Sequence, residues 1–122
     1  MSGRWNYSKS KVESLLNRNQ LSSICHIIEG DIKKTFPIFL KKLPSISISL
    51  LYVDCNAFLP AYIGMKHALS YMKSGSIICI DEHQIGGETK ALHKISEEYE
   101  LEIIKTNWKY PYGPPMYIQI KK

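Results

Sequence analysis

The sequences ISLLYVDCN, residues 48–56, and SIICIDEH, residues 76–83, decide the fold. Each is a nearly continuous apolar run that ends in acidic or amide side chains. Continuous hydrophobicity is typical of a strand covered on both faces, so both runs are predicted to lie in the middle of a parallel sheet. Between them, Pro60 and Gly75 bracket an expected helix, with Pro near its start and Gly beyond its end.

The apolar residues of this expected helix fall on a single stripe, formed by Ala61, Met65, Ala68, Leu69 and Met72. A strand–helix–strand unit crosses over in a right-handed sense, so both strands end at the same edge of the sheet. We therefore expect Asp54 and Asn56 to lie beside Asp81 and Glu82. The carboxyl ends of the strands are also where open α/β sheets bind their ligands.

The remaining elements follow from local patterns. Ser10 and Glu13 have the spacing of a capping box and predict the start of a short helix. The last two strands are joined by a turn too short for a crossover helix, so we expect them to be antiparallel. The other expected elements are a strand at 24–28, a helix around 36–43, a helix at 88–99 and the two final strands at 102–106 and 116–120.

Length and composition indicate one globular domain over residues 1–122, with 44% apolar residues. No stretch approaches the length of a membrane span, and the N-terminus lacks the apolar core of a signal peptide. Three cysteines without metal-ligand spacing favour a reduced, cytoplasmic setting. The formal net charge of +5 comes from scattered basic residues, which are typical of solvated faces, so a nucleic-acid partner is disfavoured.

Four segments together resemble the macrocin O-methyltransferase family of class I S-adenosylmethionine-dependent methyltransferases. They are GDIKKTFP (30–37), LYVDCNAF (51–58), GSIICIDEH (75–83) and GETKA (87–91). The similarity keeps order and spacing over roughly residues 8–120, whereas each motif alone would be weak. The resemblance implies an α/β three-layer sandwich whose mostly parallel sheet ends in an antiparallel hairpin. On that template the first two strands, with the Gly-rich cofactor loop, are missing, so we expect a partial domain.

The chain departs from the family pattern at several positions. Asn56 stands where the family has its second aspartate, and Phe58 stands where it has a tyrosine. Glu82 replaces the second member of an Asp-Asp pair, and Ser76 replaces the second member of a Gly-Gly pair.

The resemblance implies a magnesium site beside the acceptor hydroxyl, held by Asp54, Asp81 and Glu82, with Asp54 as the catalytic residue. Carboxylate oxygens suit Mg²⁺, and a bound ion would make a hydroxyl more acidic and ready to accept the methyl group. The alternative is that these acids only cap loops and helix N-termini.

Several other candidate residues have a structural interpretation as well as a functional one. Asp31 resembles the acid that contacts the cofactor's adenine, although aspartate before a helix is equally a helix N-cap. His83 is more simply a loop histidine than a zinc ligand. Glu88 is expected to begin a helix, where a negative charge favours the helix dipole. Tyr110 and Tyr112 could shape an acceptor pocket, but a turn is the simpler reading.

The expected function is magnesium-assisted O-methyl transfer from S-adenosylmethionine to a small hydroxylated, sugar-like acceptor. The alternative is a non-catalytic α/β binding or interaction module that has lost the cofactor site. Without its first two strands, the sheet has an exposed edge, and such edges invite pairing. We therefore also expect that the protein can form a homo-oligomer.

Overall fold

The structure of this chain is a computed structural model that describes residues 8–81, 86–109 and 115–121. It divides into two compact units, residues 1–31 and 32–122, and each is described by itself. In the first unit, helix α1 (Lys9–Arg18) begins after Ser8, whose hydroxyl accepts a hydrogen bond from the Lys11 N–H at 3.3 Å. The predicted capping box is therefore wrong. Glu13 instead pairs with Lys9, one helical turn away, at 3.8 Å.

The strand predicted at residues 24–28 is also wrong, because this segment has no regular structure. Its apolar side chains are exposed: 72% of Ile24 and 49% of Ile28 are accessible. A β-propensity pattern forms a strand only when a neighbouring strand satisfies its backbone groups. The described residues provide no such partner for residues 24–28.

The second unit contains a four-stranded mixed sheet in the order β1-β2-β4-β3. Its strands are β1 (Ile48–Val53), β2 (Met72–Ile80), β3 (Ile103–Lys105) and β4 (Met116–Gln119). The parallel pairing of β1 with β2 and the antiparallel pairing of β3 with β4 confirm the prediction. β4 is also antiparallel to β2, so three of the four strands run in the same direction.

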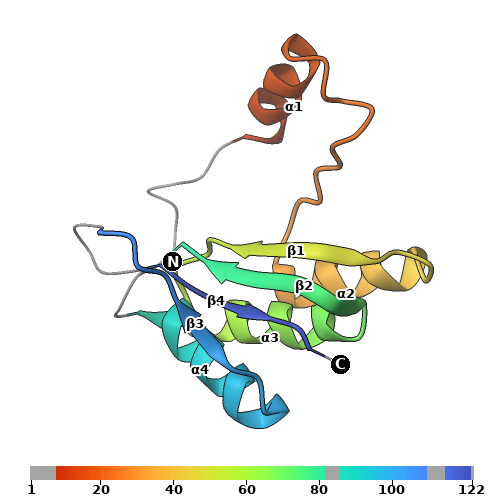
Figure 1. The fold of residues 1–122 in the computed structure, drawn as a ribbon. Helices are drawn as coiled ribbons and strands as arrows, with labels where there is room; N and C mark the ends of the chain where they lie inside the picture. Colours follow the sequence, from red (N-terminus) through yellow and green to blue (C-terminus); the bar gives the residue numbers. More distant parts are fainter. Residues whose placement is uncertain (1–7, 82–85, 110–114, 122) are drawn as a thin grey trace. The chain divides into compact units, whose positions relative to one another are not determined.

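The described part of this unit also contains three helices: α2 (Ile32–Lys42), α3 (Phe58–Leu69) and α4 (Gly87–Tyr99). Figure 1 shows α3 and α4 running along the sheet, and α2 packs against α3. The predicted C-terminal end of the crossover helix is wrong. Met72 already belongs to β2, and Gly75 lies inside that strand with φ of 93°, next to an irregularity in the β1–β2 register. The glycine thus serves a kink in the strand rather than the end of a helix.

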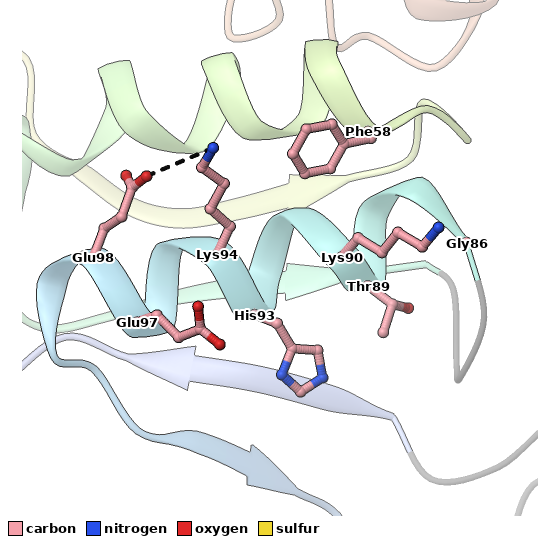
Figure 2. A pocket seen from close by; sticks show the side chains of 8 residues that line it. All are labelled: Phe58, Gly86, Thr89, Lys90, His93, Lys94, Glu97 and Glu98. Atoms are coloured by element: carbon pink, nitrogen blue, oxygen red, sulfur yellow. Dashed lines mark ion pairs between the residues drawn. The ribbon is translucent and has the colours of Figure 1, made fainter.

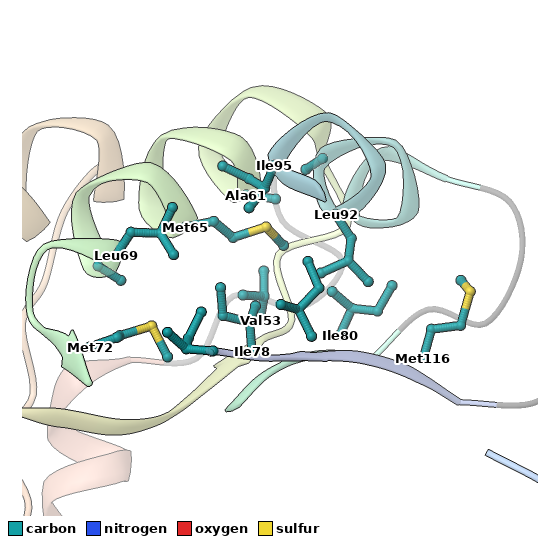
Figure 3. Close-up of a cluster of buried hydrophobic side chains, with 14 residues drawn as sticks. Val53, Ala61, Met65, Leu69, Met72, Ile78, Ile80, Leu92, Ile95 and Met116 are labelled. Carbon is teal, nitrogen blue, oxygen red and sulfur yellow. The ribbon is translucent and has the colours of Figure 1, made fainter. Parts of the chain in front are cut away.

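The hydrophobic core lies between α3, α4 and one face of the sheet (Figure 3). Side chains from α3, from α4 and from the sheet are almost completely buried, including Met65, Ile78, Leu92, Ile95 and Ile118. The same-face residues of β2 and β4 alternate with more exposed ones, as a strand with one covered face requires.

The described residues leave the other face of the sheet open at β1, which is an edge strand of the sheet. The prediction that β1 lies in the middle of a parallel sheet, covered on both faces, is therefore wrong. Leu50 is 61% exposed and Tyr52 is 56% exposed, whereas Val53 on the core side is 8% exposed. The chain has an α/β fold of the expected class. Within residues 32–122, its described elements supply the sheet and the helical layer over one face.

Candidate functional site

The carboxyl ends of β1 and β2 bring two acidic residues together. Asp54 follows the last residue of β1, and Asp81 follows the last residue of β2. The Asp81 N–H donates to the Val53 carbonyl at 3.0 Å, so the strand pairing continues to the point where both side chains emerge. The structure therefore confirms that the two strands deliver Asp54 and Asp81 to one rim of the sheet.

The electrostatics of this rim show that its acids interact. Burial raises the pKa of Asp54, and the charge of Asp81 and a hydrogen bond with it raise this pKa further. The Tyr52 hydroxyl donates a hydrogen bond to Oδ1 of Asp81. Chiefly because of that bond, the pKa of Tyr52 is raised to about 12. Tyr52, Asp54 and Asp81 thus form one coupled cluster, which we call the rim cluster.

A groove of about 610 Å³ adjoins the rim cluster on the open face of the sheet. Tyr52 and Asp81 belong both to the cluster and to the groove wall. The other lining residues include Cys79, Thr106, Trp108 and Tyr117. Aromatic side chains suit the flat faces of sugar or phenol rings, and a carboxylate can accept a hydrogen bond from a hydroxyl group.

Two features of the rim were not recognised from the sequence. In the sequence, Tyr52 is simply part of the apolar run that predicts a strand. Its position two residues before Asp54 nevertheless puts both side chains on the same side of the strand. The sequence predicts that Glu88 lies at the start of a helix, and it does. Its carboxylate also accepts hydrogen bonds from the N–H groups of Cys55 and Asn56.

The predicted metal ligands fit Mg²⁺ in part. Mg²⁺ is commonly held by one or two carboxylates with waters, and Asp54 and Asp81 provide two carboxylates whose mutual repulsion a cation would relieve. Glu82, the third predicted ligand, lies outside the described residues, as do His83, Tyr110 and Tyr112. Among the residues that are described, no group of three histidine, cysteine or acidic side chains could hold a metal ion.

Asp31, predicted to contact the cofactor, is exposed at the end of the first unit and directly precedes α2. Its role at the adenine stays a prediction. Asn56 adopts a left-handed conformation with φ of 52°, which asparagine tolerates better than most residues. Its contribution is therefore to the turn after Asp54.

A second cleft, of about 650 Å³, runs along α4 and includes Phe58 at the start of α3 (Figure 2). Its Lys94 side chain is already engaged. It pairs with Glu98 at 3.8 Å and lies 4.7 Å from the ring centre of Tyr62, which stacks on Phe58. These contacts explain how α3 and α4 are held together on their outer side, and we assign the candidate site to the rim cluster instead.

Comparison with known proteins shows a likeness in structure. An apo structure of CalS11, a TDP-rhamnose 3′-O-methyltransferase of calicheamicin biosynthesis, matches with a TM-score of 0.74 and 22% sequence identity, over 90% of this chain and 51% of that one. A second CalS11 structure matches with a TM-score of 0.74 and 21% identity, over 98% of this chain and 48% of that one. The O-methyltransferase NovP matches with a TM-score of 0.58 and 14% identity, over 98% of this chain and 55% of that one.

These matches show that the chain has the α/β fold of these methyltransferases. The chain spans about half the length of the solved structures that it matches. No family model matches the sequence, and no curated protein does so at the significance required. Membership of the macrocin O-methyltransferase family therefore stays a prediction. None of the described helices is long and apolar enough to cross a membrane.

Proposed function

We propose that this chain is a methyltransferase-like domain of the macrocin O-methyltransferase type, in which the rim cluster receives a small hydroxylated, sugar-like acceptor. The observation that carries the proposal is the meeting of Asp54 and Asp81 beside an aromatic groove, on a fold shared with sugar O-methyltransferases. The proposed donor is S-adenosylmethionine, with Asp31 at its adenine, and the proposed metal is Mg²⁺, held by Asp54, Asp81 and Glu82.

The chemistry that these groups would supply is a transferable methyl group from S-adenosylmethionine and an acceptor hydroxyl made more acidic by Mg²⁺. The chain's own residues orient the acceptor. Tyr52 and Trp108 line the groove, and so does Asp81, whose carboxylate accepts a hydrogen bond from the Tyr52 hydroxyl. Asp54, which lies beside Asp81, is the proposed acceptor of the hydroxyl proton.

Asp54 also provides the direct test of this site. Mn²⁺, a paramagnetic substitute for Mg²⁺, should broaden the NMR signals of Asp54 and Asp81 in the wild-type protein and leave the Asp81 signal sharp in an Asp54→Ala variant. Calorimetry with S-adenosylhomocysteine should detect heat of binding, and a methyl-labelled donor should label a hydroxylated sugar. Absence of both ligand-binding signals would overturn the proposal and leave a non-catalytic α/β module.

We also propose that the protein is cytoplasmic and self-associates. The described cysteines form no disulfide bond, which suits a reducing compartment. Among the described residues, β1 pairs with β2 along one edge and has no strand on its other edge.

Sedimentation velocity should show a mass that rises with protein concentration. A Leu50→Lys substitution on β1 should reduce that rise, because charged side chains oppose pairing at sheet edges; the same mass at all concentrations would contradict self-association.

A further inference from the structure

Glu88, in the first turn of α4, is completely buried, with 0% of its surface accessible. Burial of a carboxylate is costly unless hydrogen-bond donors surround it. Here the same oxygen, Oε1, accepts hydrogen bonds from the backbone N–H groups of Cys55 and Asn56, the latter at 3.0 Å. These two residues are the ones that directly follow Asp54, so a side chain more than thirty residues away fixes the segment that carries the rim acid.

The turn held in this way has a conformation that needs support. Asn56 has φ of 52°, in the left-handed region. Its N–H and that of Cys55 point to one buried acceptor rather than to a neighbouring strand. A carboxylate makes stronger hydrogen bonds than a neutral acceptor, and the positive end of the α4 dipole further stabilises a negative charge at this position. Glu88 therefore provides both the reach and the charge that the turn requires.

The residue before it strengthens the same contact. A Cβ atom on Gly87 would lie 2.1 Å from the Phe58 nitrogen and 2.5 Å from the Ala57 carbonyl carbon. Only a glycine allows the first turn of α4 to approach the backbone of this segment so closely. Gly87 brings the helix against residues 57–58, and Glu88 binds residues 55–56.

We propose that Glu88 is a positioning residue of the rim cluster: it fixes the turn after Asp54 and thereby sets the Asp54 carboxyl group against Asp81. Glu88 itself is buried behind the turn and does not touch the acceptor. The proposal rests on the proposed function for its meaning in catalysis, but the placement of Asp54 can be measured without any activity.

The test compares Glu88→Ala and Glu88→Gln with Glu97→Ala, an exposed glutamate on the same helix as the matched control. Glu88→Ala removes the acceptor, whereas the amide oxygen of Glu88→Gln can replace it in part. Hydrogen exchange at the Cys55 and Asn56 amides should accelerate at least about tenfold in Glu88→Ala, less in Glu88→Gln and not at all in Glu97→Ala. Exchange at Ile78, in the core strand, reports global unfolding.

A second readout follows Asp54 itself, by NMR of its carboxyl carbon. Once the turn is released, the chemical shift of this carbon at a fixed pH should move from its wild-type value, because the turn that follows Asp54 is no longer held by Glu88. Mn²⁺ affinity should fall about 10- to 100-fold, as is usual when a residue that orients a ligand is lost. If wild-type protein binds no Mn²⁺, the proposed metal role fails, while hydrogen exchange and the Asp54 chemical shift still test the positioning.

If Glu88→Ala does not fold, Glu88→Gln decides the question alone, since its neutral amide is the weaker acceptor. Faster exchange confined to Cys55 and Asn56, together with a shifted Asp54 carboxyl signal, would support the proposal. Unchanged exchange at Cys55 and Asn56, with an unchanged Asp54 carboxyl signal, in a folded Glu88 variant would overturn it. So would an acceleration of exchange that is equal at Ile78.

Discussion

The two faces of the sheet carry similar residues but have opposite surroundings. On the face covered by α3 and α4, Ile78 and Ile118 are 0% exposed. On the other face, Leu50 is 61% exposed and Tyr52 is 56% exposed. Leu50 is as apolar as its core-facing neighbours, so local sequence does not distinguish the two sides. The covered face provides stability, whereas the open face provides the groove that adjoins the rim cluster.

The largest expected effect separates the two faces directly. Ile78→Ala should lower the free energy of unfolding by about 2–5 kcal/mol, because it leaves a cavity under α3 and α4. Leu50→Ala on the open face should lower it by about 0.5 kcal/mol or less. Urea unfolding of both variants measures the difference. Equal losses would mean that the open face is buried in solution.

The second prediction tests how the covering layer is attached. Gly87→Ala should cost about 1–3 kcal/mol, because its methyl group would collide with the backbone of Ala57 and Phe58. Gly64→Ala, in the middle of α3, is the control. Its Cβ would make ordinary contact with Ile32 at 3.7 Å, so the better helix propensity of alanine should stabilise the protein by about 0.5–1 kcal/mol. Thermal unfolding should shift in opposite directions, and a shift in the same direction would contradict the close approach at Gly87.

The comparison of the two faces also shows what could be read from the sequence. The β1–α3–β2 unit, α4 and the final hairpin were predicted because their apolar patterns and turn residues are local. The meeting of Asp54 and Asp81 followed from the handedness of one crossover. Two predictions were wrong: a strand at residues 24–28, and a β1 strand covered on both faces. Both depend on neighbouring elements, which the local sequence does not specify.

Glu88 illustrates a different limit. A glutamate after two glycines is a normal helix start, and nothing in that local pattern indicates complete burial. Its partners, Cys55 and Asn56, are backbone groups and leave no mark in the sequence. Gly87 offered the one available signal, since a glycine inside a helix start can indicate close approach of another backbone segment.

The third prediction concerns the rim between the two faces. The pKa of Asp54 is raised in the folded state, so its charged form is disfavoured there. The stability linked to this group is complete below its ordinary value of 3.8 and is lost as the pH rises through the raised pKa. Asp54→Asn removes that loss and should raise the melting temperature at neutral pH by about 1–3 °C.

The pH and metal dependence of this shift provides its controls. The gain from Asp54→Asn should vanish near pH 3, where the wild-type carboxyl group is also uncharged. Added Mg²⁺ should stabilise the wild-type protein and not the variant, which reverses their order. If Asp54→Asn is less stable than wild type without metal at neutral pH, the repulsion between Asp54 and Asp81 is not a feature of the rim.

The smallest effect is expected on the open face, where Tyr52 donates its hydroxyl proton to Asp81. The pKa of Tyr52 is raised to about 12, so the stability linked to this group is present up to its ordinary value of 10.0 and is lost as the pH rises toward 12. Asp81→Asn should return this pKa toward 10.0. Tyrosinate absorbance during an alkaline titration, with Tyr52→Phe subtracted to isolate the signal, measures the change.

Because an exposed hydrogen bond contributes little to stability, the melting temperature of Asp81→Asn should hardly move at neutral pH. A Tyr52 titration that is the same with and without the Asp81 charge would separate the tyrosine from the acids. The open face would then be an apolar surface that lies beside the rim cluster without sharing its charge.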